Sequence, residues 1–355
     1  MKRLSNKKEY SFLELYNEFI RHSKNGKRIQ PNGKKISKGT ISNYLNTLKL
    51  LTDFSQKKDF NLRVRSIRKL TSKEMELERK YWRKFYRSFS DYLYDDLECY
   101  DNYVGQSFKT IKAFFSYLNK DIGLMVGEFY KLFYTRSEEI AVFTLMPEEL
   151  NFLIYDKEFE ERLSKRLRET KDLFVFGCTV ALRVSDLLNI RRENIRVIGD
   201  SSYLAVRSKK TSTDTLVKLP LYAVEIINKY KKQKRKLLPQ FNSSNLNQYI
   251  KKLIEQAGLN HEVALTRERR GKVIKQLVNG KPKRFCDVVS THTMRRTAIT
   301  TMLCLGMPEQ LVRNISGHAP NSKEFYRYVL WAQTYQDQEH EKVFEKLKSK
   351  KLKVA

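Results

Sequence analysis

The sequence predicts a mainly α-helical protein with a small β-sheet, divided into two domains. Apolar residues recur at helical spacing through most of the first ~130 residues, as expected for amphipathic helices. Short runs of alternating β-type residues follow near residue 200 and are separated by a polar turn, which is typical of a hairpin or small sheet. The 355 residues are enough for two domains that each bury a core.

The helical spacing of large apolar residues in 1–135 predicts a small all-helical domain, with these residues on one face of each helix. A polar, basic loop at 23–39 separates the first two helices. Ser37 or Thr40 is the expected N-cap of the second helix, because a hydroxyl there can accept a hydrogen bond from a free backbone amide. The expected helices cover residues 10–20, 40–54, 71–89 and 107–118.

A linker is expected at 136–145, before a second domain at 146–330 and a helical tail at 331–355. Pro147 followed by two glutamates is a helix-start signal. The mixed, basic pattern of 263–289 gives no assignment. The expected helices cover 147–156, 159–166, 169–181, 223–236, 245–257, 291–305, 308–316, 322–330 and 333–351, and the expected strands cover 195–198, 203–207 and 216–219.

Net charge is the strongest bulk signal. The chain has 70 Lys+Arg against 40 Asp+Glu, a formal charge of +30. Residues 1–135 carry 28 basic and 15 acidic side chains, a balance of +13, and residues 136–355 carry 42 and 25, a balance of +17. Such a charge repels itself and suits a polyanionic partner. Nucleic acid fits best, because each phosphate contact releases counterions; the alternative is a basic protein with no nucleic-acid role.

Several classes of protein are not indicated. No apolar stretch follows the basic N-terminus, so no signal peptide is expected, and no apolar run approaches the ~18 residues of a membrane span. Cys99, Cys178, Cys286 and Cys304 lack paired spacing, which predicts reduced thiols in a cytosolic protein rather than zinc or disulfides. The phosphate-binding loop, the H-E-x-x-H motif and the Gly-rich dinucleotide turn are absent, so no cofactor or metal is expected.

A stretch near the C-terminus gathers the side chains with the clearest chemistry. It holds His292, Arg295, His318, Tyr326 and Tyr328. His292 stands three residues before Arg295, so both lie on one helix face and can reach one ligand. Histidine, arginine and tyrosine without clustered acids suit work on a phosphate, with fixed cations and a protein nucleophile, rather than on a metal.

Two further cations complete the pattern. Arg183 stands at an expected helix end in CTVALRVSDLLNI, and Lys210 at the tip of the expected hairpin in RSKKTSTD. Each alone would be read as an ordinary surface residue. In chain order, Arg, Lys, His-x-x-Arg, Gly-His and Tyr form a far more specific combination. On these motifs the chain resembles the tyrosine recombinases (phage-type integrases), and most of all the integrases of bacterial mobile elements such as conjugative transposons.

The resemblance covers about residues 10–330 and is carried by the family motifs T-G-L-R-x-[SD], the hairpin Lys followed by Thr, H-x-x-R, Gly-His and the nucleophilic tyrosine. It implies a core-binding (SAM-like) helical domain followed by a mixed α/β catalytic domain. The residues that match the family's catalytic positions are Arg183, Lys210, His292, Arg295, His318 and Tyr328.

The sequence departs from the family pattern in a few places. Ala181 stands where the family usually has glycine. The interval from the Gly-His histidine to the tyrosine is one residue longer than usual, so Tyr326 stays open as an alternative nucleophile. The local Phe-x-x-Tyr-hydrophobic pattern favours Tyr328. The hairpin lysine is Lys209 or Lys210, and the following threonine favours Lys210.

The resemblance implies a site-specific recombinase that cuts and rejoins DNA through a covalent 3′-phosphotyrosine, for integration or excision of a mobile element. In that chemistry Tyr328 attacks phosphorus, Arg183 and Arg295 hold the non-bridging oxygens, and Lys210 protonates the leaving 5′-oxygen. His292 and His318 add hydrogen bonds, and His292 is a candidate acid–base partner for the tyrosine proton.

The partners implied by the resemblance are double-stranded DNA, further copies of the chain in a homotetramer on DNA, and accessory DNA-bending proteins. The expected location is the bacterial cytoplasm, associated with the nucleoid when on DNA. Two alternatives stay open. One is a type IB topoisomerase-like enzyme that religates the same strand, and the other is a DNA-binding regulator without catalysis.

Overall fold

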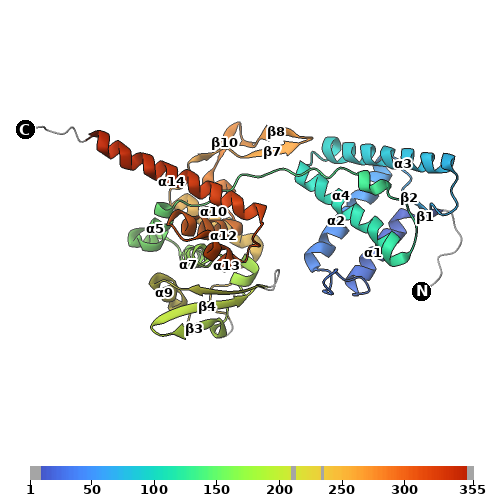
Figure 1. Ribbon diagram of the computed structural model, residues 1–355. Helices are drawn as coiled ribbons and strands as arrows, with labels where there is room; N and C mark the ends of the chain where they lie inside the picture. Colours follow the sequence, from blue (N-terminus) through green and yellow to red (C-terminus); the bar gives the residue numbers. More distant parts are fainter. Residues whose placement is uncertain (1–8, 209–212, 233–235, 350–355) are drawn as a thin grey trace, which may run out of the picture. The chain divides into compact units, whose positions relative to one another are not determined.

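The computed structural model describes residues 9–208, 213–232 and 236–349 (Figure 1). The chain divides into two compact units. The helical unit comprises the chain up to Ile140 together with Thr266–Lys275, and the C-terminal unit comprises Ala141–Leu265 and Gln276 onwards. The boundary at Ile140 falls within the expected linker. Among the described residues, no helix is long and apolar enough to cross a membrane.

The helical unit is built on four long helices, as the sequence predicts. Two short strands that were not expected, β1 and β2, pair antiparallel, with Tyr10 opposite Val64. The elements in chain order are β1 (Glu9–Ser11), α1 (Phe12–Lys24), α2 (Lys38–Lys57), β2 (Arg63–Arg65), α3 (Ser72–Asp91), the short π-helix Tyr92–Asp96, α4 (Asp101–Tyr117), the short π-helix Leu118–Ile122 and the 3₁₀ helix Phe129–Leu132.

Side-chain caps fix the helix starts of this unit. The Ser37 hydroxyl accepts a hydrogen bond from the Thr40 amide at the start of α2, so of the two expected caps it is Ser37 that serves. At the start of α3, Thr71 and Glu74 form a reciprocal capping box. Each such cap satisfies an otherwise free amide and is worth about 1 kcal/mol.

The core of the helical unit is largely aromatic. Phe12 of α1 lies 4.8 Å from Phe114 of α4, measured between ring centroids, and Trp82 of α3 lies 4.8 Å from Phe115. Tilted and edge-on rings such as these add to the apolar burial. The fully buried aromatic side chains among the described residues of this core are Phe12, Tyr16, Phe19, Phe54, Phe85, Phe89, Tyr92, Phe108, Phe114 and Phe115.

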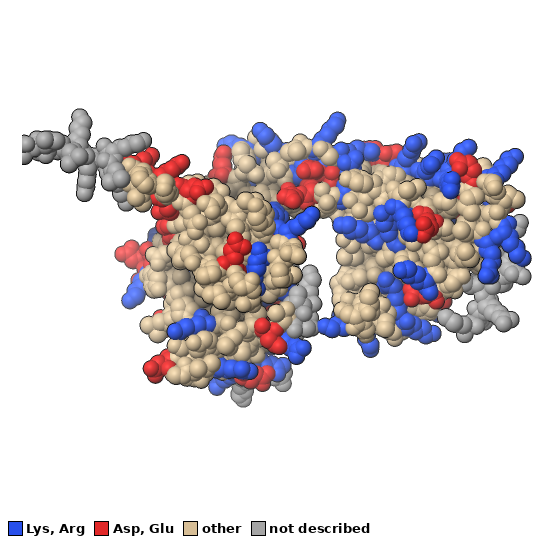
Figure 2. All heavy atoms as spheres, in the orientation of Figure 1, with Lys and Arg blue, Asp and Glu red and all other residues tan. Residues whose placement is uncertain are grey.

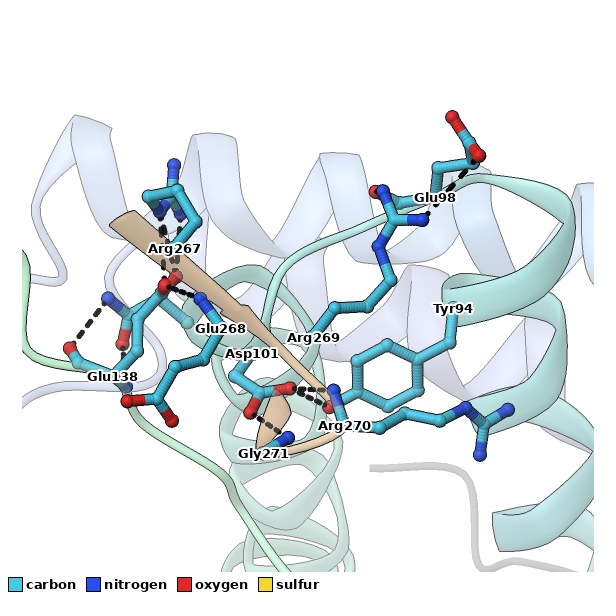
Figure 3. Close-up of polar contacts among 10 residues, drawn as sticks. Tyr94, Glu98, Asp101, Glu138, Arg267, Glu268, Arg269, Arg270 and Gly271 are labelled. Carbon is cyan, nitrogen blue, oxygen red and sulfur yellow. Dashed lines mark hydrogen bonds and ion pairs between the residues drawn. The ribbon is translucent and has the colours of Figure 1, made fainter. Parts of the chain in front are cut away.

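A hairpin from far along the chain belongs to the same unit. Strands β7 (Thr266–Arg269) and β8 (Lys272–Lys275) pair antiparallel, with Arg267 opposite Ile274. They lie in the stretch that gave no assignment from sequence. Figure 3 shows the polar contacts that the hairpin makes with α4 and with the segment around Glu138.

The C-terminal unit combines helices with small antiparallel sheets. Its elements are α5 (Pro147–Tyr155), α6 (Lys157–Arg162), α7 (Lys165–Val180), α8 (Val184–Leu187), the 3₁₀ turn Arg192–Asn194, β3 (Ile195–Ile198), β4 (Ser201–Arg207), β5 (Asp214–Lys218), α9 (Leu221–Lys229), α10 (Ser243–Gln256), β6 (Glu262–Val263), β9 (Leu277–Val278), β10 (Lys281–Arg284), α11 (Phe285–Val288), α12 (Thr291–Cys304), α13 (Glu309–Ser316) and α14 (Lys323–Ser349).

The expected hairpin near residue 200 is part of a three-stranded sheet in the order β3-β4-β5. Leu204 at its centre is fully buried and faces Val217 across the strands. Alternate residues of β5 are buried and exposed, as expected for a strand with one face on the core. The pairing continues past the strand ends, where the Ser208 amide donates to the Thr213 carbonyl over 2.9 Å.

Helices α7 and α12 pack closely in the middle of this unit. A Cβ at Gly177 would lie 2.6 Å from the Met294 sulfur, so the absence of a side chain at Gly177 is what permits this approach. The packing brings Arg295, the next residue of α12, alongside the end of α7.

Helix α14 differs from the expected pair of helices at 322–330 and 333–351. It runs unbroken from Lys323 to Ser349, because Trp331 and Ala332 between the two expected pieces contain no helix breaker. Phe325 at its start is fully buried with Ala298 and Ile299 of α12, so the first turns of α14 are fixed on the unit's core.

Candidate active site

Arg183 is placed by a sharp turn after α7. The helix ends at Val180, and Ala181 adopts a left-handed conformation with φ 55°. Arg183 then serves as the N-cap of the short helix α8. Its Nη1 donates to the hydroxyl of Ser208 over 3.0 Å. The guanidinium is therefore tied to the residue that directly follows strand β4.

Arg295 is the buried centre of the site, with 8% of its surface exposed. Its Nη1 donates to the Ala181 carbonyl over 2.8 Å, and its Nη2 donates to the Ser316 carbonyl over 2.6 Å. The planar guanidinium fork thus connects the ends of α7 and α13. Burial and the neighbouring Arg183 lower the pKa of Arg295 to about 10, so it stays charged at neutral pH.

His318 follows α13, whose last turn closes on Gly317 in the left-handed conformation with φ 64°. Its Nδ1 lies 2.8 Å from the Ser316 hydroxyl, and its ring nitrogens lie 3.4 and 3.5 Å from Arg295 Nη2. Burial, and then the nearby cations Arg295, Arg183 and Arg313, lower the pKa of His318 to about 4. The imidazole is therefore neutral at physiological pH.

Tyr328 lies on the second turn of α14 and is partly buried. Its ring packs edge-on against His318, with 6.0 Å between ring centroids. Tyr328 also lies close enough to Arg295 to raise the pKa of that guanidinium, as do Asp186 and Glu324, and so offsets part of the lowering by burial. Tyr326 is 58% exposed. The two tyrosines are two residues apart on a helix, so their side chains leave it in different directions.

His292 occupies the first turn of α12, one turn before Arg295, and is exposed. Lys209 and Lys210 lie outside the described residues. The residues that flank this segment lie at the site: Ser208 binds Arg183, and Thr213 lies within 4 Å of the position that a Cβ would take on Gly317.

The structure therefore brings four of the predicted side chains together: Arg183, Arg295, His318 and Tyr328. It adds two hydroxyls that sequence reasoning missed, those of Ser208 and Ser316. Each stands next to a predicted feature, directly before the hairpin lysines and directly before Gly-His. Their contacts with Arg183 and His318 could not be deduced from that position. In the described part of the chain, no group of three metal-binding side chains occurs.

A sequence comparison identifies the family. The model of the phage integrase family matches residues 156–333, a range that includes every predicted catalytic position. The chain belongs to the phage integrase family. This confirms the expected tyrosine recombinase, an enzyme of DNA recombination. No curated protein sequence matches the chain.

Solved structures share the fold at low sequence identity. The XerH site-specific recombinase, bound to a palindromic difH substrate after cleavage, has a TM-score of 0.58 at 14% identity over 93% of this chain and 85% of that one. A lambda integrase dimer bound to a COC′ core site gives 0.59 at 12%, over 91% and 78%. The Tn1549 transposon integrase with circular intermediate DNA gives 0.55 at 13%, over 89% and 94%. They support the predicted fold class, a helical domain followed by a mixed α/β domain.

Proposed function

We propose that the chain cuts and rejoins DNA strands through a covalent phosphotyrosine at Tyr328. The observation that carries this proposal is the convergence of Arg183, Arg295, His318 and Tyr328 from four separate segments. Two guanidinium groups, one neutral imidazole and one phenol in a partly buried site match the needs of phosphodiester cleavage by a protein nucleophile.

The two arginines would hold the scissile phosphate. A phosphodiester carries one negative charge, and its in-line transition state places charge on the non-bridging oxygens. Arg295 is fixed through Nη1 and Nη2 by two carbonyl groups, and Arg183 is tied to Ser208. Donors that are already fixed in place cost no reorganisation when charge develops on the phosphate.

The remaining residues would handle protons. The Tyr328 oxygen attacks phosphorus and loses its proton, for which His292 is the candidate acceptor. The bond from phosphorus to the 5′-oxygen breaks, and Lys210 gives that oxygen a proton. His318, neutral at physiological pH because its pKa is about 4, contributes a hydrogen bond rather than a charge. Attack by a different 5′-hydroxyl then releases Tyr328 and rejoins the strands without ATP.

The proposed substrate is duplex DNA, and the biological role is integration or excision of a mobile element. Lys and Arg side chains occur over the visible faces of both units (Figure 2), in keeping with the net charge of +30. One structural relative is a transposon integrase with circular intermediate DNA, and another is a lambda integrase tetramer on a Holliday junction. We extend a tetrameric assembly on DNA to this chain as part of the proposal.

The test is to trap the covalent intermediate. In a DNA duplex that carries the recombination site and a nick beside the cleavage position, cleavage releases a short fragment that carries the 5′-hydroxyl. Religation then has no 5′-hydroxyl to use, so the covalent adduct accumulates. We expect wild-type protein and Tyr326→Phe to form the adduct and Tyr328→Phe to form none while still binding DNA. Mass spectrometry of the adduct names the modified residue. An adduct on Tyr326, or an undiminished one in Tyr328→Phe, would refute the assignment.

A further inference from the structure

The β7–β8 hairpin belongs to the helical unit although its sequence neighbours lie in the C-terminal unit. It leaves and re-enters the C-terminal unit at one point, where the Gln276 amide donates to the Leu265 carbonyl over 2.8 Å. The hairpin is therefore a compact insertion in the sequence of the C-terminal unit, and its main contacts are with the helical unit. Those contacts are polar and centre on two buried carboxylates of the helical unit, Glu138 and Asp101 (Figure 3).

Glu138 receives the first strand of the hairpin. Its side chain is only 1% exposed. It accepts hydrogen bonds from Arg267 Nε and Nη2, the shortest 2.7 Å, and from the Glu268 amide at 2.5 Å. The backbone of Glu138 is itself fixed on α4, because it exchanges two hydrogen bonds with the Asn102 amide side chain. These bonds fix the position from which the Glu138 carboxylate reaches the hairpin.

Asp101, the first residue of α4, receives the turn of the hairpin. It is 1% exposed. One carboxylate oxygen accepts from the Arg270 amide over 2.9 Å, and the other accepts from the Gly271 amide over 2.8 Å. Both turn residues have positive φ, 54° and 76°, as in the tight turns that suit hairpins. Tyr94 donates its hydroxyl to Asp101 over 2.6 Å and holds the carboxylate in place.

A ring of weaker contacts surrounds these two. Arg270 reaches Asp91 and Asp95 over 2.7 and 2.8 Å, and the Arg269 guanidinium donates to the Glu98 carbonyl over 2.9 Å. These outer partners are mostly exposed, so salt screens them and each contributes little. The buried contacts at Glu138 and Asp101 therefore dominate the attachment.

We propose that Asp101 and Glu138 form a receptor for the β7–β8 hairpin of their own chain, and that the docked hairpin holds the helical unit to the rest of the protein independently of the 136–145 linker. The receptor presents carboxylates, which repel DNA phosphates and accept arginine and backbone amides. If the hairpin left, Glu138 would lose its bonds to Arg267 and to the Glu268 amide, and Asp101 would lose those to the Arg270 and Gly271 amides.

The test is to cut the linker and ask whether the units stay together. A protease recognition sequence is inserted between Ile140 and Ala141, and the full-length protein is cut and run on a size-exclusion column at 150 mM salt. We expect the two pieces of the wild-type chain to elute together as a 1:1 complex. Arg267→Ala should weaken their association by roughly 100-fold or more, the usual effect of removing one partner of a buried pair.

Matched variants make the result specific. Lys272→Ala removes one positive charge from an exposed side chain at the start of β8 and should change the association by less than about twofold. Arg270→Ala removes two exposed ion pairs and the contact of the guanidinium with the Tyr94 ring, 4.8 Å from its centroid, and should cost less than about tenfold. Replacing 266–275 by an Asn-Gly turn between Leu265 and Gln276 should separate the pieces entirely. Circular dichroism checks that each variant remains folded, and Arg267→Lys is the fallback if Arg267→Ala unfolds.

Three outcomes would overturn the proposal. The cut wild-type pieces could separate at micromolar concentration, which would mean that the hairpin does not hold them. The pieces could stay together without the hairpin, which would mean that other contacts do. The uncut protein could be a dimer that becomes a monomer when the hairpin is removed, in which case the receptor takes the hairpin of a second copy.

Discussion

The Arg295 guanidinium donates to the carbonyl of Ala181, 2.8 Å away, and Ala181 is a non-glycine residue in the left-handed conformation. The turn that carries this carbonyl also starts the segment leading to Arg183. Both catalytic arginines of the proposed site therefore depend on one strained residue, at which the family usually has glycine.

Replacing Ala181 by glycine should stabilise the protein. An L-residue in the left-handed region costs roughly 1–2 kcal/mol. Glycine's added flexibility in the unfolded chain and the lost burial of the Ala181 methyl group, which is fully buried, each cancel part of the gain. We expect the free energy of unfolding of Ala181→Gly to rise by at most about 0.5 kcal/mol in a denaturant titration. The reverse change, Gly317→Ala at φ 64°, should lower it by about 1 kcal/mol. A loss of stability in Ala181→Gly would contradict this account of the turn.

Replacing Arg295 by lysine should slow cleavage strongly even though the charge is kept. The fork donates through Nη1 and Nη2 to carbonyls at the ends of two helices, and a single ammonium group cannot span both and still face a phosphate. Removing one preorganised donor costs about 10²–10³ in rate, so we expect at least a 100-fold slower appearance of the covalent adduct. Arg284→Lys, at an exposed ion pair, is the control and should react at the wild-type rate.

His318 should make stability depend on pH. Its folded-state pKa is about 4, below the unfolded value of about 6.5. Between these values the unfolded state binds more protons, so this contribution to stability is fully present above pH 6.5 and is lost as pH falls towards 4. The loss is at most about 3 kcal/mol. Denaturant titrations of wild type and His318→Gln across this range should diverge, because the variant lacks this proton uptake.

Parallel curves for the two proteins would contradict the depressed pKa. Because carboxylates titrate in the same range, only the difference between the two curves is informative. The same shift predicts that the role of His318 in cleavage does not change between pH 8 and pH 6, since the imidazole stays neutral over that range.

The sequence predicts the parts of the fold that have a local signal. The helices of both units and strands β3 to β5 follow from apolar periodicity and caps, and the family motifs locate Arg183, Arg295, His318 and Tyr328. The β7–β8 hairpin could not be predicted in the same way. Its strands are rich in charge, and the groups that satisfy them, Asp101 and Glu138, lie more than a hundred residues away.

The supporting hydroxyls of the site were missed for a related reason. Ser208 and Ser316 have no pattern of their own, and their importance comes from a hydrogen bond to Arg183 and to His318. A serine next to a motif residue becomes informative only when the backbone turns around it are known. The choice of Tyr328 over Tyr326 rests in the sequence on the local Phe-x-x-Tyr-hydrophobic pattern. The Phe325 of that pattern is fully buried in the structure, and Tyr328 packs against the same cluster.

The close approach of Gly105 to the segment that carries Glu138 gives the last prediction. A Cβ at position 105 on α4 would lie 1.9 Å from the carbonyl oxygen of Arg136. Because the obstacle is backbone, it cannot rotate away. We expect Gly105→Ala to lower the free energy of unfolding by about 2 kcal/mol or more and to weaken hairpin docking, since the segment that presents Glu138 must shift.

Gly39→Ala is the matched control for this substitution. Gly39 lies in the first turn of α2, and a Cβ there would come no closer than 4.0 Å to another heavy atom. Alanine is favoured over glycine in a helix by about 1 kcal/mol, so here the same change should raise the free energy of unfolding. If Gly→Ala lowers the free energy of unfolding at position 105 and raises it at position 39, the loss at Gly105 is due to the contact with the Arg136 carbonyl. An unchanged free energy of unfolding in Gly105→Ala would refute the close approach.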